Sequence, residues 1–69
     1  MEWHNKERLP TIRNDSQIEF SIDVLIYSIT FKTHTIGWYD FKSNQWLFLN
    51  SENQSYFKWR YLTNKYDKP

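Results

Sequence analysis

Side chains that could perform catalysis or bind a metal are few in this 69-residue chain. It has no cysteine and two histidines, His4 and His34, whereas a zinc site needs three or four closely spaced ligands. We expect both histidines at the surface. Asp23 lies inside an apolar run and Asp40 at the end of another, and solvent-facing or turn-capping roles are favoured because aspartate rarely leaves water. No phosphate-binding glycine loop or nucleophile motif occurs. We therefore predict no enzyme, no metal and no cofactor.

One segment combines cations and aromatic rings. Lys58-Trp59-Arg60-Tyr61 interleaves them as single-stranded nucleic-acid binders do. In a strand, however, alternation places Lys58 and Arg60 on the face opposite Trp59, so rings and charges would not serve one ligand. The net charge of +1 also lacks the basic excess typical of nucleic-acid-binding domains. Nucleic-acid binding through Lys58, Arg60 and Tyr61 is therefore the alternative prediction.

The elements that would position these residues are strands. Apolar and β-branched residues alternate or cluster over residues 20–31, 34–41, 45–50 and 56–62, and polar turn-formers separate these segments. The short connections predict an antiparallel meander over residues 20–62. Near Leu25 the apolar positions change faces, which a bulge or burial of both faces would explain. The fold class is a mostly β domain with one small antiparallel sheet of three to four strands. The alternative prediction is a helix over residues 53–65, which would make the fold class α+β.

Residues 1–19 are predicted to form an extended arm and loop packed on the sheet, and residues 63–69 a frayed tail of the same single domain. With 69 residues and no disulfide, the chain must obtain its core from 4 Trp, 5 Tyr and 5 Phe. We expect Trp3, Trp46 and Trp59 to be largely buried. Arg8 beside Pro10 is expected to contact an aromatic ring or an aspartate and so fix the arm.

Several short motifs occur in a fixed order. They are Trp3 followed by Arg8-Leu9-Pro10, then Val24-Leu25-Ile26-Tyr27, Gly37-Trp38-Tyr39-Asp40, Trp46, and Trp59 with Leu62. From Trp3 to Leu62 the chain resembles the small bacterial and phage family called domain of unknown function 551. That family closes on a T-H-W-M-P-L-P motif, whereas this chain has Lys58 in place of the histidine and Tyr61-Leu62-Thr63 in place of Pro-Leu-Pro. The resemblance implies a phage or prophage setting and no established activity.

The positions shared with that family are interpreted as packing anchors. Trp3 and Pro10 would dock the arm over the sheet, with Trp59 as the surface that receives them. Glycine within a strand often marks a bulge or the close approach of a neighbouring ring, which is the role expected of Gly37. The predicted anchors are Trp3, Arg8, Leu9, Pro10, Gly37, Trp46 and Trp59.

The leading prediction for function is a non-enzymatic protein-interaction or accessory module. A short sheet has two edges, and such edges pair with a protein partner or a second copy. No apolar run approaches the 18 residues of a membrane helix, and the charged N-terminus lacks the apolar segment of a signal peptide. We therefore expect a cytoplasmic protein with no membrane association.

Overall fold

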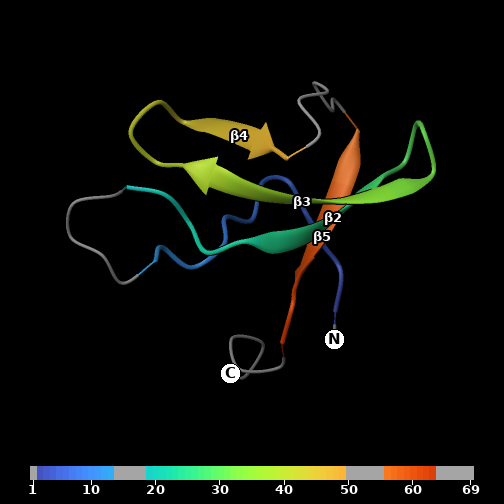
Figure 1. Cartoon of the computed structure of the whole chain (residues 1–69), viewed down its shortest axis with the longest axis horizontal. Helices are drawn as coiled ribbons and strands as arrows, with labels where there is room; N and C mark the ends of the chain where they lie inside the picture. Colours follow the sequence, from blue (N-terminus) through green and yellow to red (C-terminus); the bar gives the residue numbers. More distant parts are fainter. Residues whose placement is uncertain (1, 14–18, 50–55, 64–69) are drawn as a thin grey trace.

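Five strands form one antiparallel sheet in the computed structural model, which describes residues 2–13, 19–49 and 56–63 (Figure 1). Their order across the sheet is β1-β5-β2-β3-β4. No helix occurs among the described residues, so the mostly β prediction is confirmed, and the helix alternative is wrong for residues 56–63. The predicted loop at 14–18 and the tail at 64–69 lie outside the described residues. The strands are β1 His4–Asn5, β2 Val24–Ser28, β3 Thr33–Asp40, β4 Gln45–Phe48 and β5 Phe57–Tyr61.

The topology departs from the predicted meander at the last strand. β2, β3 and β4 follow one another in the sheet, but β5 pairs with β2 and not with β4. Figure 1 shows β5 crossing β2 and β3 steeply, as expected of a strongly twisted sheet. β2 is the most continuously apolar segment, VLIYS, and a neighbour on each side keeps its backbone away from water. The central place therefore belongs to β2.

β2 is shorter than predicted because irregular backbone flanks it. Val24 pairs with Gly37, and Phe20 pairs with Asp40. Phe20 therefore lies four residues before Val24, whereas Asp40 lies only three residues after Gly37, so the segment before β2 contains one extra residue. This is a β-bulge between Ser21 and Val24. Beyond the bulge, Leu25 and Tyr27 are half-buried on the second face. The bulge therefore explains the change of faces near Leu25, whereas burial of the far end on both faces does not hold, because Ile29 and Phe31 are exposed.

The turn between β2 and β3 begins directly after Ser28. The Ser28 carbonyl accepts a hydrogen bond from the Lys32 N–H (2.8 Å), and its hydroxyl accepts one from the Phe31 N–H (3.1 Å). Lys32 adopts a φ of 57°, in the left-handed region. Ile29 and Phe31 are consequently in the turn and exposed, although the sequence placed them in the strand.

The core lies on one face of the sheet, here called the core face. Trp59 is 0% exposed at its centre and makes edge-to-face contact with Tyr61 at 4.9 Å. His4 is also buried, 4.7 Å from the Trp59 ring, so the prediction of a surface histidine is wrong at this position. Trp3 and Trp46 are only half-buried, so the prediction of three largely buried tryptophans holds for Trp59 alone. The buried core cluster consists of Val24, Ile26, Phe57, Trp59 and Tyr61, and the partly buried side chains of Ile22, Trp46 and Phe48 pack against it.

Gly37 is required by close packing on this face. A methyl group at Gly37 would lie 2.8 Å from Ile26 Cγ1 and 2.9 Å from the Leu47 carbonyl oxygen. The close approach was predicted, but the neighbour is an aliphatic side chain and a backbone oxygen, not a ring.

The N-terminal arm covers part of the core face. The Trp59 indole N–H donates to the carbonyls of Asn5 (3.1 Å) and Arg8 (2.8 Å), and the Trp46 indole N–H donates to the Lys6 carbonyl at 3.4 Å. Pro10 is buried, as expected of an anchor. The arm therefore docks on Trp59 through the backbone carbonyls of Asn5 and Arg8, whereas Trp3, predicted to dock against Trp59, packs on the opposite face of the sheet.

Candidate functional site

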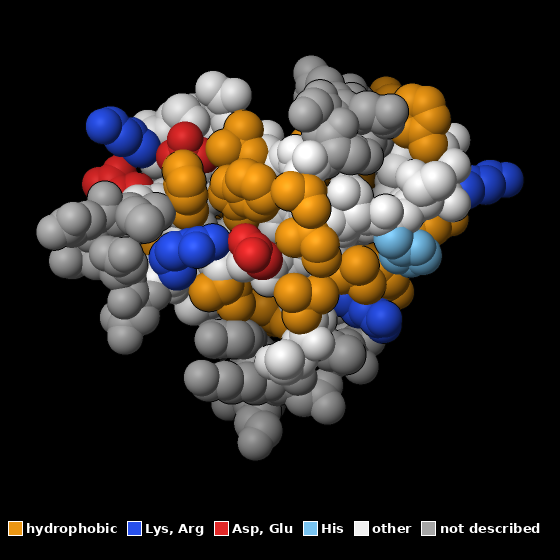
Figure 2. Space-filling view, in the orientation of Figure 1, with side chains coloured by type: hydrophobic (Ala, Val, Ile, Leu, Met, Phe, Trp, Pro, Cys, Tyr) orange, Lys and Arg blue, Asp and Glu red, His pale blue; other side chains and the backbone are white. Residues whose placement is uncertain are grey.

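The second face of the sheet, here called the open face, carries a different set of side chains. Because residues alternate along each strand, every position next to a core residue points to this side. None of these side chains is buried; Asn5, His34 and Gln45 are exposed and the others are half-buried. They are Asn5 on β1, Leu25 and Tyr27 on β2, His34, Ile36, Trp38 and Asp40 on β3, Gln45 and Leu47 on β4, and Lys58 and Arg60 on β5. In Figure 2, hydrophobic side chains form a band across the middle of the molecule, with charged side chains along it.

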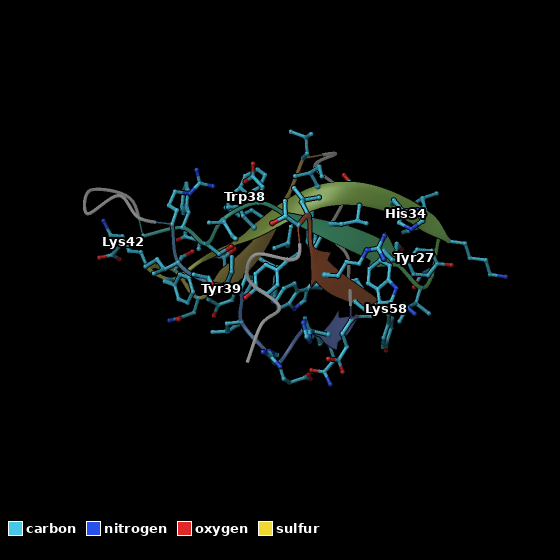
Figure 3. All side chains as sticks on the ribbon, turned by 90° about the horizontal axis from the view of Figure 1, so that it is seen from below. Tyr27, His34, Trp38, Tyr39, Lys42 and Lys58 are labelled. Atoms are coloured by element: carbon cyan, nitrogen blue, oxygen red, sulfur yellow. The ribbon has the colours of Figure 1, made fainter. Side chains whose placement is uncertain are left out.

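Strand register gathers rings and cations at one end of the open face. Asn5, Lys58, Tyr27 and His34 occupy one row that crosses β1, β5, β2 and β3. Trp3 immediately precedes β1, and its side chain lies on this same face. Figure 3 shows Tyr27, His34 and Lys58 close together, away from Trp38, Tyr39 and Lys42.

Trp3, Tyr27, His34, Lys58 and Arg60 form what we call the ring–cation cluster. The centroid of the Trp3 ring lies 6.1 Å from that of Tyr27 and 6.3 Å from that of His34, and Tyr27 and His34 are 4.9 Å apart. Lys58 Nζ lies 5.2 Å from the Trp3 centroid and 5.5 Å from that of Tyr27. The Arg60 guanidinium carbon lies 4.9 Å from the Trp3 centroid. These are cation–π distances, so both cations are held against the Trp3 ring.

The two cations of the cluster lack carboxylate partners among the described residues. Asp23 is instead paired with Arg13 at 3.1 Å. Arg60 Nε is buried without a hydrogen-bond acceptor in the described part of the chain. Cation–π contact does not neutralise the charges of Lys58 and Arg60, so two cations lie at this end of the open face although the net charge of the chain is only +1.

The cluster surrounds a shallow depression rather than an enclosed cavity. Its volume is about 250 Å³, and its lining comes from Trp3, Tyr27, His34 and Lys58. Enclosed small-molecule sites usually measure about 300–1,000 Å³ and cover most of their ligand. The depression is therefore an open surface feature, smaller than a typical enclosed site.

The structure divides the residues predicted from the last strand between two faces. Lys58 and Arg60 lie in the ring–cation cluster, but Tyr61 is buried on the core face, where its hydroxyl is 3.1 Å from Thr11 Oγ1. The sequence analysis missed Trp3, Tyr27 and His34 as companions of these cations. Alternation along β2 places Tyr27 on the face that Val24 and Ile26 do not share, so the sequence pattern could have assigned Tyr27 to the open face. Nothing in the sequence pairs the arm with β5.

The remaining predicted anchors lie outside the cluster. Gly37, Pro10 and Trp46 pack on or beside the core face, whereas Leu9 is exposed. Arg8 is exposed, and its guanidinium makes no ion pair or ring contact within the described residues, contrary to the expected contact. Its carbonyl, which accepts from Trp59, fixes the arm instead.

The two candidate acids have structural roles. Asp40 caps the β3–β4 turn, where its carboxylate accepts hydrogen bonds from the Ser43 hydroxyl (2.7 Å) and the Lys42 N–H (2.9 Å). The Ser43 hydroxyl bond is the main cause that lowers the pKa of Asp40 below its ordinary value of 3.8. Asp23 is 53% exposed and pairs with Arg13, as its solvent-facing interpretation requires.

Within residues 2–13, 19–49 and 56–63, no group of three or more His, Cys, Asp or Glu side chains is arranged to hold a metal. The same residues include no helix long and apolar enough to span a membrane.

A second surface feature is apolar. Ile29 (52% exposed), Phe31 (58%), Leu49 (68%) and Tyr56 (68%) are large side chains that remain in contact with water. Ile29, Tyr56 and Phe57 also line a groove of about 170 Å³ together with residues 5–7 of the arm. Exposed apolar side chains of this size are typical of protein-interaction surfaces when they are contiguous.

Comparison with models of protein families, with curated proteins and with solved structures finds no match for this chain.

Proposed function

We propose that this protein is a non-enzymatic module that binds single-stranded nucleic acid on the open face of its sheet. The observation that carries the proposal is the ring–cation cluster, in which Trp3 and Tyr27 share a face with Lys58 and Arg60. The sequence analysis ranked a protein partner first because a short sheet has free edges, because Trp59 and the cations of β5 lie on opposite faces, and because the net charge is only +1. Trp3 and Tyr27 supply rings on the cationic face, which answers the second of these arguments.

The arrangement suits an unpaired strand for two physical reasons. Bases of a single strand stack on exposed rings of a sheet, and each stack contributes about 1–3 kcal/mol. Lys58, which lies over the Trp3 and Tyr27 rings, and Arg60, which lies over the Trp3 ring, supply positive charge for the phosphates between successive bases. Duplex DNA does not offer its base faces to such a platform, so we expect a preference for single strands.

The test is fluorescence anisotropy of a labelled single-stranded oligonucleotide of about ten thymidines titrated with the protein. Trp3→Ala is expected to weaken binding about 5- to 150-fold with the salt slope unchanged, because it removes one stack and no charge. Lys58→Ala is expected to weaken binding and to lower the slope of log affinity against log salt by about 0.7, because one phosphate contact is lost.

Lys42→Ala is the matched control. It removes the same charge from the turn before β4, at the opposite end of the molecule from Lys58 (Figure 3). We expect little change in affinity. An equal effect of Lys42→Ala and Lys58→Ala would show that binding is diffuse attraction to cations, and no binding by the wild-type protein would reject the proposal.

A protein-interaction module is the second candidate, supported by the exposed side chains of Ile29, Phe31, Leu49 and Tyr56. In that case the oligonucleotide is not bound, and Ile29→Lys or Tyr56→Lys abolishes association with a protein partner or with a second copy, seen by sedimentation velocity. The phage or prophage setting and the cytoplasmic location stay proposals with either function.

A further inference from the structure

The N-terminal arm passes from one face of the sheet to the other. Trp3 lies on the open face, His4 and Asn5 pair with β5 at the sheet edge, and the chain from Lys6 to Pro10 runs along the core face. The strand β1 that makes this crossing contains two residues. So short a pairing has few backbone hydrogen bonds, and on the core side side-chain hydrogen bonds add to it.

Trp59 is the side chain that holds it. Its indole N–H is shared between the Asn5 carbonyl (3.1 Å) and the Arg8 carbonyl (2.8 Å). The Arg8 N–H also donates to the Asn5 carbonyl at 3.2 Å, so residues 5–8 form a closed turn around the indole nitrogen. The Trp46 indole N–H reaches the same turn at the Lys6 carbonyl, with a longer bond of 3.4 Å.

From this geometry we infer that Trp59 is a positioning residue for the ligand-binding site on the opposite face, because its hydrogen bonds to the arm hold Trp3 in the ring–cation cluster. The inference rests on the proposed function. Trp59 touches no ligand, since it is 0% exposed on the core face. Its effect on binding depends on the fraction of molecules in which Trp3 is docked in the ring–cation cluster. The apparent affinity is the affinity of the docked form multiplied by that fraction.

The variant that tests this inference is Trp59→Phe, which keeps an aromatic ring in the core and removes the indole N–H. We expect oligonucleotide affinity to fall at least about 5-fold, with the affinity of Trp3→Ala as the lower limit. In the Trp3→Ala background the same substitution is expected to change affinity less than 2-fold, because no ring remains to be positioned. Trp46→Phe is the matched control and is expected to have a smaller effect, because its bond to the arm is longer. Equal losses in the presence and absence of Trp3 would overturn the inference.

Two measurements without ligand separate this inference from the proposed function. The indole resonance of Trp3 in a proton–nitrogen NMR spectrum is expected to move toward its solvent-exposed position in Trp59→Phe. Trypsin, which cleaves after Lys6 and Arg8, is expected to cut the arm faster in this variant while circular dichroism shows the sheet retained. If the wild-type protein binds no oligonucleotide, the proposed function fails, and these two measurements still decide whether Trp59 positions Trp3. An unchanged Trp3 resonance and unchanged cleavage would refute that role.

Discussion

Gly37→Ala tests the strand register most directly, because the register decides whether this substitution raises or lowers the free energy of unfolding. In an ordinary strand position with free space, replacing glycine by alanine stabilises a protein by about 0.4–1 kcal/mol, because the unfolded chain loses conformational freedom. Gly37 does not have that space. Its added methyl group would lie 2.8 Å from Ile26 Cγ1 and 2.9 Å from the Leu47 carbonyl oxygen.

The magnitude follows from which of these neighbours can move. Ile26 is 0% exposed and surrounded by the core, and the Leu47 oxygen belongs to the backbone of β4, so neither can give way by a simple rotation. Overpacking of this kind costs about 1–3 kcal/mol. For a domain of 60–100 residues each kcal/mol lowers the melting temperature by about 4–8 °C, so we expect a decrease of roughly 5–20 °C.

Thermal and urea unfolding followed by circular dichroism measure this change. Thr33→Ala, at an exposed position of the same strand, is the control for the effect of alanine in β3, and we expect a change of less than about 0.5 kcal/mol. A Gly37→Ala protein that melts at or above the wild-type temperature would show that β3 does not pass between Ile26 and β4 in the register described.

Three further substitutions test the core, a turn and a cap. Trp59→Ala is expected to cost about 3–5 kcal/mol, which in a domain of this size should abolish the cooperative unfolding transition seen by circular dichroism. Lys32→Gly should raise the free energy of unfolding by up to about 1 kcal/mol, because Lys32 occupies the left-handed region at a φ of 57°; a lower urea midpoint would contradict this. Asp40→Asn should lower stability near neutral pH. Because the pKa of Asp40 is lowered in the folded state, its contribution is complete above its ordinary value of 3.8 and is lost as pH falls through the folded-state pKa, so the difference from wild type should shrink below about pH 4.

The strands could be predicted from the sequence where one face is apolar and the other polar. β5 alternates cleanly, and its burial follows that alternation from Phe57 to Tyr61. The limits of β2 could not be predicted, because the bulge before Val24 and the left-handed Lys32 after it depend on pairing with β3 and on turn geometry. The place of β5 beside β2 is a long-range choice that no local pattern specifies.

Half of the candidate site followed from the sequence and half did not. Alternation correctly placed Lys58 and Arg60 together, away from Trp59. Trp3 could not be assigned to their face, because its position depends on two residues of β1 pairing with a strand more than fifty positions away. The net charge also does not show how the charges are distributed: Asp23 and Asp40 are engaged by Arg13 and by a turn, while the cations of the cluster have no such partners among the described residues.

Stability and ligand binding should therefore respond to different substitutions in this small sheet. Gly37→Ala strains the contacts of β3 with Ile26 and with the backbone of β4 on the core face, and neither of these contacts involves the arm or its hydrogen bonds. We expect it to lower the melting temperature while the oligonucleotide affinity of the folded protein changes less than about 2-fold. Trp59→Phe should lower that affinity more than Gly37→Ala does for the same decrease in melting temperature, because it releases Trp3 from the open face. If affinity followed melting temperature equally in both variants, the loss of binding would reflect unfolding alone, and Trp59 would have no separate role in positioning the site.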